Sequence, residues 1–391
     1  MHQQLSLRRP IRILHVVGGM NRGGVETWLM HVLRHIDRAD FQMDFLVHTE
    51  RPCAYDEEII ALGSRIIPCL SPQRPWVYAR NFRRALRAHG PYDVIHSHVH
   101  RFSGYVLRLS KVDVPIRIAH SHNDSSSVEA RGGLLRRSYV TLTGRWIRAH
   151  ATVGLSCSDR AAAALFGEAW MDDRRWETMP YGIDLAPFRS SVDLGDVRRE
   201  LAIPPDAWVI GHVGRFVEQK NHRFLAEVAI ELLKREPRAF LLLVGDGPLR
   251  PSIEQQVNGA GIAHRVRFAG LRGDVHRLMR GAMDFFLFPS LWEGLGLVLI
   301  EAQAAGLPCI ISDVIPREAD VVGPLIRRVS LAQPVARWVD ETLSQRDAAN
   351  AIPHRDSLAQ VECSPFNIQR AMGRLEEIYR AALLVPGTAR Q

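Results

Sequence analysis

Short aliphatic runs alternate with amphipathic stretches along the whole chain, and this alternation restricts the fold more than any other feature. The first half contains six such runs, at residues 11–17, 42–48, 64–70, 92–98, 115–122 and 150–156. Stretches with helical spacing of apolar residues lie between them, most clearly at 25–36, 77–89 and 132–148. Strands that alternate with helices form βαβ units, whose parallel sheets are covered by helices on both faces. The first half is therefore expected to be a doubly wound α/β domain.

The pattern lapses at residues 180–206, where prolines and glycines punctuate short pieces, and then restarts. Five further aliphatic runs follow, at 208–214, 239–245, 265–270, 284–290 and 307–313. A chain of 391 residues exceeds the size at which one hydrophobic core keeps growing, so two domains are expected. We place them at 1–190 and 191–366, followed by a terminal helical segment at 367–391. Ligands of open α/β sheets bind beyond the carboxyl ends of the strands, so the chemistry is expected between the two domains.

Composition narrows the class of protein. Hydrophobic residues make up 46% of the chain and charged residues 24%, as in a globular enzyme rather than a disordered chain. No apolar run approaches the roughly 20 residues of a membrane-spanning helix, and the amino end does not have the pattern of a signal peptide. The five cysteines show no zinc-type or paired spacing, which favours reduced thiols in a cytoplasmic protein.

The excess of basic over acidic residues is confined to the first half of the chain. The first 190 residues contain 26 basic and 18 acidic side chains, and this surplus equals the net charge of +8 for the whole chain. A basic domain could attract nucleic acid, an anionic membrane surface or a phosphorylated substrate. No helix-turn-helix, RNA-binding aromatic motif or zinc finger is present in the sequence, which disfavours nucleic acid. An arginine-rich genome is the alternative explanation, since only three of the 50 basic residues are lysine.

Two glutamates bracket the apolar run "EGLGLVLIE" at 293–301. Glu293 lies in an expected strand-to-helix turn and Glu301 on the following helix, which Gly306 ends. Gly296 would leave the unpaired amides of the helix start accessible to an anion such as a diphosphate. A carboxylate cannot bind phosphate, but it can accept hydrogen bonds from vicinal hydroxyls, so the pair predicts a sugar and a ribose. A helix-terminal charge beside a solvated helix face is the alternative.

Two other loops follow strand ends. "GHVGRFVEQKN" places Arg215 and Lys220 between a strand and a helix, where both cations could grip phosphate oxygens, although two solvated cations would look the same. "GGMNRGG" places Gly23 and Gly24 before the first helix, where the backbone could approach a ligand closely or simply turn. It lacks the strict GxGxxG of dinucleotide sites.

Histidines gather at two strand ends, in "HSHVH" (96–100) and "HSHND" (120–124). Alternate residues of a strand share a face, so a metal site is conceivable. No carboxylate or cysteine completes an obvious zinc set, and we favour histidines that are hydrogen-bonded or contact the substrate. We therefore expect no metal.

These motifs together resemble the retaining glycosyltransferases of family 4, which have the GT-B fold, over nearly the whole chain. The resemblance rests on "GGMNRGG", "DVIHSH", "HSHN", "CSDRAA", "MPYGID", "VGRFVEQKN", "LLLVGDGP", "VRFAG" and "FPSLWEGLGLVLIEAQAAGLPCI". The last of these matches the family's E-x7-E signature through Glu293 and Glu301. The resemblance implies two Rossmann-like doubly wound domains that face each other across a cleft, with a C-terminal helix that crosses back to the first domain.

The resemblance also implies a role for each candidate residue. Glu293 and His122 would face the transferred sugar as the catalytic residues. Arg215 and Lys220 would hold the donor diphosphate, and Glu301 the ribose hydroxyls. The other donor-binding positions act through the backbone and are Leu295, Gly296, Gly23 and Gly24. "SDVIPREAD" departs from the family's Gly-Gly-x-Pro-Glu turn, with Glu318 as the counterpart of its glutamate.

The implied reaction is transfer of a sugar from a nucleotide donor to a polyprenyl-diphosphate-linked or oligosaccharide acceptor. We expect the donor to be a UDP-sugar. It would proceed with retention and without a metal or other cofactor. The amino-terminal motifs look most like members that build exopolysaccharide or capsule. Such an enzyme would be cytoplasmic or peripheral at the inner membrane face, where arginines of 78–90 and 131–140 would meet anionic lipids. Nucleotide-sugar epimerases and sugar phosphorylases share the fold and are the alternatives; the latter need pyridoxal phosphate on a lysine.

Overall fold

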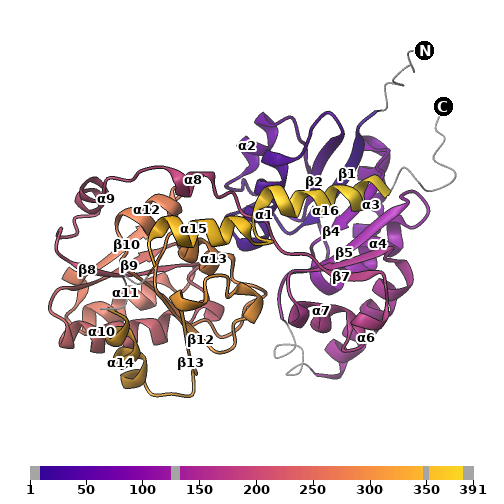
Figure 1. Ribbon diagram of the computed structural model, residues 1–391. Coiled ribbons are helices and arrows are strands. Elements are labelled where there is room, and N and C mark those ends of the chain that lie inside the picture. Colours follow the sequence, from indigo (N-terminus) through magenta and orange to yellow (C-terminus); the bar gives the residue numbers. More distant parts are fainter. Residues whose placement is uncertain (1–8, 125–132, 347–351, 382–391) are drawn as a thin grey trace, which may run out of the picture. The chain divides into compact units, whose positions relative to one another are not determined.

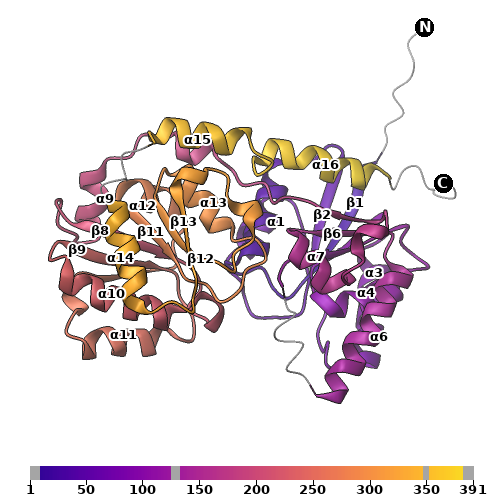
Figure 2. The same cartoon turned by 60° about the horizontal axis from the view of Figure 1, so that its bottom comes forward.

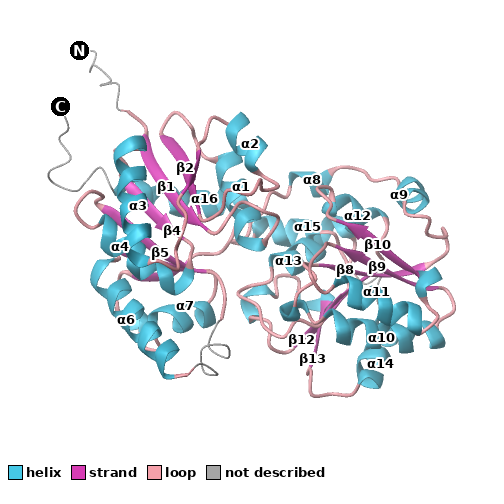
Figure 3. Ribbon diagram, turned by 180° about the vertical axis from the view of Figure 1, so that it is seen from behind, coloured by secondary structure: helices cyan, strands magenta, loops and turns pink. Residues whose placement is uncertain are grey.

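The computed structural model describes residues 9–124, 133–346 and 352–381 (Figure 1). The chain divides into two compact units, residues 1–182 with 368–391, and residues 183–367. The division lies in the stretch where the strand pattern lapses, and the last described helix belongs to the first unit. Each unit is built on one parallel sheet flanked by helices (Figure 3), so the expected α/β class is confirmed.

The sheet of the first unit has seven parallel strands in the order β3-β2-β1-β4-β5-β6-β7. The strands are β1 (Ile11–Val17), β2 (Phe41–Val47), β3 (Ile66–Pro68), β4 (Val94–Ser97), β5 (Ile116–Ser121), β6 (Val153–Ser156) and β7 (Trp176–Thr178). All six expected runs form strands, and β7 was not predicted. The strand order reverses between β1 and β4, and ligands of such sheets bind at the carboxyl ends beside this switch point.

Helices cover both faces of this sheet. Those described are α1 (Gly24–His35), α2 (Asp56–Ala61), α3 (Pro75–His89), η1 (His100–Phe102), α4 (Ser103–Ser110), α6 (Leu134–His150), α7 (Asp159–Phe166), η2 (Trp170–Asp172) and α16 (Ile368–Arg380). Helix α4 packs between α3 and α6 (Figure 2), whereas α16 lies against α1. The C-terminal helix is therefore part of the first unit.

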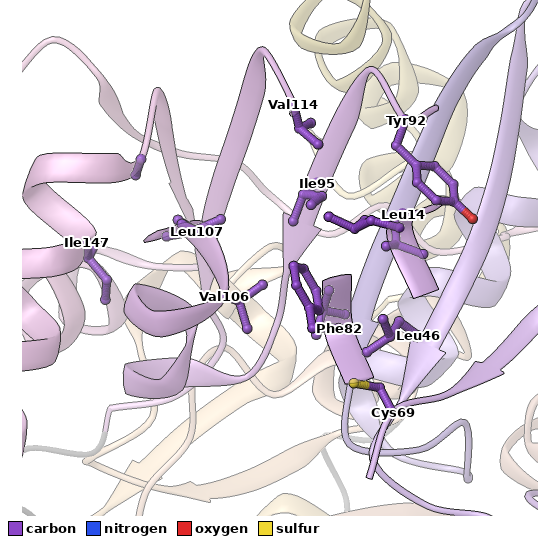
Figure 4. Packing of buried hydrophobic residues seen from close by; sticks show 14 of the residues in the cluster. Leu14, Leu46, Cys69, Phe82, Tyr92, Ile95, Val106, Leu107, Val114 and Ile147 are labelled. Atoms are coloured by element: carbon purple, nitrogen blue, oxygen red, sulfur yellow. The ribbon is translucent and has the colours of Figure 1, made fainter. Parts of the chain in front are cut away.

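Alternation along the strands gives the two faces of the sheet different chemistry. One face is apolar, and in Figure 4 its Leu14 and Ile95 lie close to Phe82 of α3 and Val106 of α4. The register pairs Leu14 with Ile95, and the next pair along is His15 with His96. Because successive side chains point to opposite faces, these histidines lie on the face covered by α1 and α16.

The sheet of the second unit has six parallel strands in the order β10-β9-β8-β11-β12-β13. The strands are β8 (Trp208–Val213), β9 (Ala239–Val244), β10 (Val266–Gly270), β11 (Phe285–Phe288), β12 (Cys309–Ser312) and β13 (Ile326–Val329). Its switch point lies between β8 and β11, so the carboxyl ends of these two strands flank the expected ligand site. The five expected runs form strands, and β13 at the edge was not predicted.

Helices also flank the second sheet, with α10 packed against α11 and α14, and α13 packed against α15. The described helices are α8 (Ala186–Arg189), α9 (Leu194–Glu200), η3 (Glu218–Lys220), α10 (His222–Arg235), α11 (Arg250–Gly259), η4 (Ala263–Arg265), α12 (Val275–Gly281), α13 (Leu297–Ala304), η5 (Arg317–Ala319), η6 (Gly323–Leu325), α14 (Val335–Arg346) and α15 (His354–Cys363). The two chain segments that matter for chemistry are the β8–α10 and β11–α13 connections, because both leave the switch point.

Candidate active site

The two-glutamate motif lies where β11 leaves the sheet, as expected. The chain turns after Phe288, and Gly296, at φ +88°, is the N-cap of α13. Glycine adopts this backbone conformation at little steric cost, so it allows the abrupt start of the helix. The first amides of α13 have no partners within the helix, and they follow directly after Leu295 and Gly296. The predicted helix start is thus present, with the geometry that an anion site requires.

Glu293 and Lys220 form a tight ion pair in the strand-to-helix turn. Lys220 Nζ lies 2.6 Å from Glu293 Oε1, the glutamate is buried, and the ammonium lies 4.9 Å from the ring centre of Phe288. The second carboxylate oxygen accepts a hydrogen bond from Gln219 Nε2 at 3.3 Å. Both oxygens of Glu293 are therefore held by residues of the β8–α10 connection, which fixes the side chain.

Gln219 is a site residue that the sequence reasoning missed. Its Nε2 also donates to the backbone carbonyl of Trp292 at 2.9 Å. The backbone carbonyl of Gln219 accepts from the amide of Leu291 at 2.8 Å. Asn221 Nδ2 donates to the carbonyl of Pro289 at 3.1 Å. The segment 219–221 therefore clamps the turn that contains Glu293. The only signal for Gln219 in the sequence is its position beside Lys220.

Arg215 follows β8 on a loop that is held by the loop after β9. Its side chain is exposed, while the neighbouring Phe216 amide donates to the carbonyl of Asp246 at 3.0 Å. A Cβ atom at Gly245 would collide with the carbonyl of Gly214. Glycine in the "GDG" motif lets the two loops approach closely, and their contact fixes the backbone on either side of Arg215.

Glu301 lies on α13 and is half-buried. Loss of solvation raises the pKa of its carboxyl to about 7. Within residues 9–124, 133–346 and 352–381 the carboxyl group of Glu301 has no hydrogen-bond or ion-pair partner. A desolvated carboxyl group with unused acceptor capacity is suited to paired hydroxyl donors. Recognition of a ribose requires these properties.

Gln303 fixes the helix that carries Glu301. Its Oε1 accepts from the amides of Val321 and Val322 at 2.9 and 2.7 Å, and its Nε2 donates to the carbonyl of Ala319 at 2.8 Å. The side chain is fully buried. It thus joins α13 to the η5 region, whose Glu318 is exposed.

We expect Gln303→Ala to lower the free energy of unfolding of the second unit by about 2–4 kcal/mol, because the buried Val322 amide loses its partner and the Val321 amide and Ala319 carbonyl each lose one of two hydrogen bonds. Urea unfolding measures this. Gln256→Ala is the matched control: Gln256 also donates to a carbonyl, that of Arg223, but at an exposed position. Its change should stay within about 0.5 kcal/mol. Equal effects of the two substitutions would contradict the anchoring role.

His122 belongs to a chain of buried imidazoles in the first unit. Its Nε2 lies 2.8 Å from His98 Nδ1, and His98 Nε2 lies 2.9 Å from His15 Nδ1. The Nδ1 of His122 is hydrogen-bonded to the hydroxyl of Tyr181. Burial lowers the pKa of His15 and of His122 to about 3, so the rings are neutral. Both nitrogens of His122 are thus engaged by neighbours, which fixes the ring that the family resemblance places opposite the sugar.

A second chain of imidazoles lies beside the first. His96 Nε2 and His120 Nδ1 are 2.9 Å apart, and His96 Nδ1 lies 2.8 Å from the hydroxyl of Tyr379 on α16. The ring of Trp28 meets His120 edge-on at 5.2 Å between centroids. Burial, with the neighbouring imidazoles, lowers the pKa of His96 and His120 well below the usual value. The C-terminal helix is therefore hydrogen-bonded into the centre of the first unit.

The five histidines contain two groups close enough to ligate a metal, His15–His96–His98 and His98–His120–His122. Facing nitrogens within them lie at hydrogen-bond distances, 2.8–2.9 Å. Neutral imidazole has one donor and one acceptor nitrogen. Contacts with neighbouring rings and tyrosines engage both nitrogens of His96, His98 and His122, whereas Nε2 of His15 and of His120 is buried without a partner among the described residues. The histidines are hydrogen-bonded to one another, and the expected absence of a metal stays a prediction.

Gly23 and Gly24 lie at the start of α1, at the carboxyl end of β1. Gly23 is the N-cap, and a Cβ atom there would collide with the carboxylate of Glu26, whereas one at Gly24 would meet nothing within 4 Å. At Gly23 only the mobile end of the Glu26 side chain would have to move. Gly24 leaves open space above the helix start, which suits backbone approach to a ligand.

The comparisons with known proteins account for both units. Residues 22–187 match Glycosyltransferase Family 4, and residues 195–352 match Glycosyl transferases group 1. The candidate glycosyltransferase EpsF of Bacillus subtilis (strain 168) is 39% identical over 376 residues, covering 94% of this chain and 96% of its own. The chain belongs to the family 4 glycosyltransferases. The transferase class expected from the sequence is thereby confirmed.

Two further relatives extend the comparison. The UDP-Gal:alpha-D-GlcNAc-diphosphoundecaprenol alpha-1,3-galactosyltransferase of Escherichia coli is 28% identical over 234 residues, 57% of this glycosyltransferase and 58% of its own chain. The crystal structure of Anabaena HepE in complex with UDP and glucose has a TM-score of 0.77 at 18% identity, with 95% and 100% of the two chains covered. The GT-B fold expected from the sequence is thus confirmed. No helix within the described residues is long and apolar enough to cross a membrane.

Proposed function

We propose that this glycosyltransferase transfers a sugar, with retention, from a UDP-sugar to a polyprenyl-diphosphate-linked acceptor in the synthesis of a bacterial exopolysaccharide, capsule or other surface glycan. The observation that carries the proposal is the ion pair of Lys220 with buried Glu293 just before the start of α13, with Arg215 exposed on the same β8–α10 connection as Lys220. The E. coli relative, named for a UDP-sugar donor and a diphosphoundecaprenol acceptor, and the UDP complex of HepE support the choice of donor and acceptor.

The chemistry follows from the charges. As the bond between the anomeric carbon and the phosphate oxygen breaks, negative charge grows on the departing diphosphate. Lys220, Arg215 and the amides of α13 offset that charge, in the role that a divalent cation has in other transferases. The acceptor hydroxyl attacks from the face that the diphosphate leaves, and its proton passes to the departing phosphate oxygen. Glu293 orients the sugar through its hydroxyls, while Glu301 holds the ribose.

A donor screen tests the proposed function. Purified protein is incubated with individual nucleotide sugars and lipid-linked acceptors, with and without a chelator, and products are identified by mass. We expect one sugar to be added from a UDP-sugar, and the same rate in the presence of the chelator. Conversion of a nucleotide sugar without an acceptor would favour an epimerase, and phosphorolysis of a glycan would favour a phosphorylase. Loss of transfer that added metal restores would contradict the metal-independent mechanism.

Glu301→Gln should weaken UDP binding by roughly 10- to 100-fold, because the carboxylate accepts charge-assisted hydrogen bonds from the ribose. Hydroxyl donors favour the ionised form, so the affinity of the wild type should rise as pH increases through about 7, the pKa of the free group. Calorimetry at pH 6 and pH 8 measures both effects. A 2′,3′-dideoxy-UDP control, which lacks both hydroxyls, should bind equally to both proteins within a factor of about two. An unchanged UDP affinity in the variant would remove Glu301 from the ribose site.

The basic helices of the first unit are proposed to rest on the membrane that carries the acceptor, at its cytoplasmic face. We expect binding to anionic but not to neutral vesicles, lost at high salt, since each nearby arginine contributes about 1 kcal/mol. Reversal of charge at Arg83, Arg84, Arg136 and Arg137, all exposed, should abolish co-sedimentation. Binding that survives this reversal would favour a soluble acceptor. Arg131, another candidate, lies outside the described residues.

A further inference from the structure

An apolar groove of about 600 Å³ lies in the first unit, between the start of α3, the η1–α4 segment and α6. Its walls include Phe102 and Tyr105 from the η1–α4 segment, Leu142 and Trp146 from α6, and His48 at the end of β2. This volume is within the range of roughly 300–1,000 Å³ typical of small-molecule sites. His48 and Val99 follow the carboxyl ends of β2 and β4, so the groove opens at the ligand-binding edge of the sheet.

Close helix packing builds the groove. A Cβ atom at Gly104 would collide with the carbonyl of Thr143, so glycine allows α4 and α6 to approach each other. This contact brings the rings of Tyr105 and Trp146 to 5.7 Å between centroids. Tyr105 Oη donates to the carbonyl of Pro75 at 2.9 Å and joins the wall to the start of α3. The aromatic walls are therefore held by the fold and do not depend on a ligand to assemble.

The apolar surface continues outward along one side of α6. Leu135, Tyr139, Leu142 and Trp146 recur at helical spacing, and the first three are exposed, Leu135 at 90% and Leu142 at 45%. Trp76, which follows groove residue Pro75, is also exposed. A continuous apolar strip that runs from solvent into a groove is uncommon on the surface of a monomer and marks a site for an apolar partner.

The charge around the groove selects the kind of apolar partner. Helices α3, α4 and α6 carry nine arginines and no aspartate or glutamate. All nine are exposed, and none forms an ion pair with another residue in the described part of the chain. The arginines are Arg80, Arg83, Arg84, Arg87, Arg108, Arg136, Arg137, Arg145 and Arg148. An apolar groove among unpaired cations complements a molecule with a hydrocarbon chain and an anionic head.

We propose that this groove binds the isoprenoid chain of the acceptor's polyprenyl-diphosphate carrier, next to the diphosphate, with the apolar strip of α6 leading the chain from the membrane. The proposal rests on the proposed function, because it names the part of the enzyme that recognises the lipid of that acceptor. The groove would let the enzyme distinguish an acceptor with an isoprenoid chain from a soluble sugar diphosphate that lacks the chain.

Binding of geranylgeranyl diphosphate, below its micellar concentration, tests the groove without any need for turnover. Leu142→Asn should weaken binding about tenfold, the loss expected when one or two methylene groups are no longer buried. Leu142→Trp should fill the groove and weaken binding further. Met171→Asn is the matched control, since Met171 is 74% exposed in the same unit and does not line the groove. Inorganic diphosphate, the head without the chain, should bind equally to all four proteins.

The outcomes separate this proposal from the proposed function. Equal affinity of wild type and both Leu142 variants for the prenyl diphosphate would contradict isoprenoid binding in the groove, even if transfer to lipid-linked acceptors is observed. Weaker binding in the Leu142 variants would support the groove even if the donor screen finds no such transfer. With an active acceptor, the variants should raise KM for the lipid-linked form alone and leave kcat unchanged. A dimer in solution that both Leu142 variants dissociate would assign the strip to a second copy instead and overturn the proposal.

Discussion

The first unit should unfold in mild acid, between about pH 4 and pH 6, because five buried imidazoles must remain neutral for it to stay folded. His15, His96, His98, His120 and His122 are all buried, and loss of solvation lowers the pKa of each from its usual value. In the unfolded chain the same groups titrate near 6.5. Below that pH the unfolded state binds more protons, so the stability present above pH 6.5 is lost as the pH falls toward the folded-state pKa values.

The expected size of this effect is large. Each histidine contributes about 1.4 kcal/mol per pH unit once its unfolded form is protonated, so five contribute about 7 kcal/mol per pH unit. The whole stability of a domain is about 5–15 kcal/mol. Hydrogen exchange of peptides from β1 and β5, measured from pH 7 to pH 4, would follow the first unit separately from the second.

A single substitution provides the control for the acid prediction. His15→Gln removes one titrating ring and keeps a polar group beside His98, so the slope of stability against pH should fall by about 1.4 kcal/mol per pH unit. His89→Gln changes a histidine at the end of α3 that is only partly buried, and should leave the slope unchanged. Stability that is constant between pH 7 and pH 5 would show that the five rings do not form a neutral network.

The fold could be predicted where strands are buried on both faces. Runs such as "IRILHVV" and "AFLLLV" are apolar nearly throughout, and all eleven expected runs are strands of the two sheets. The strands β7 and β13 were missed, because "WET" and "IRRV" are short and carry charges. Both lie at sheet edges, where a strand has one neighbour and can expose charged side chains, so the sequence contains no apolar run to reveal them.

The candidate site could be predicted as separate loops but not as a set of contacts. Glu293 and Lys220 were each assigned from local patterns, yet they are 73 positions apart and their ion pair depends on how β8 and β11 pair in the sheet. His15 was not considered, because an isolated histidine within an aliphatic strand has no motif. Only the register that places it beside His96 makes it part of the imidazole network. Contacts of this kind are set by tertiary structure.

Lys220→Ala should lower turnover by roughly 10²–10³-fold, the cost typical of removing one group that stabilises developing negative charge. Two losses combine in this variant: the departing diphosphate loses a cation, and buried Glu293 loses the partner at 2.6 Å that holds it. A buried carboxylate without a partner is destabilising, so part of the decrease could come from a displaced or protonated Glu293 rather than from the diphosphate. Initial rates at saturating donor, together with thermal unfolding, measure the two losses.

The double variant Lys220→Ala/Glu293→Gln separates the two causes. A neutral amide needs no cation, so the double variant should recover the stability of the wild type. Its turnover should stay well below that of Glu293→Gln alone, because the diphosphate still lacks its cation. Lys234→Ala removes an exposed lysine of the same unit, paired at the surface with Glu231, and should leave both properties unchanged. Wild-type turnover in Lys220→Ala would remove Lys220 from the diphosphate site. Equal turnover of the double variant and Glu293→Gln alone would assign the lysine to positioning Glu293 instead, because only that role disappears when the carboxylate is neutralised.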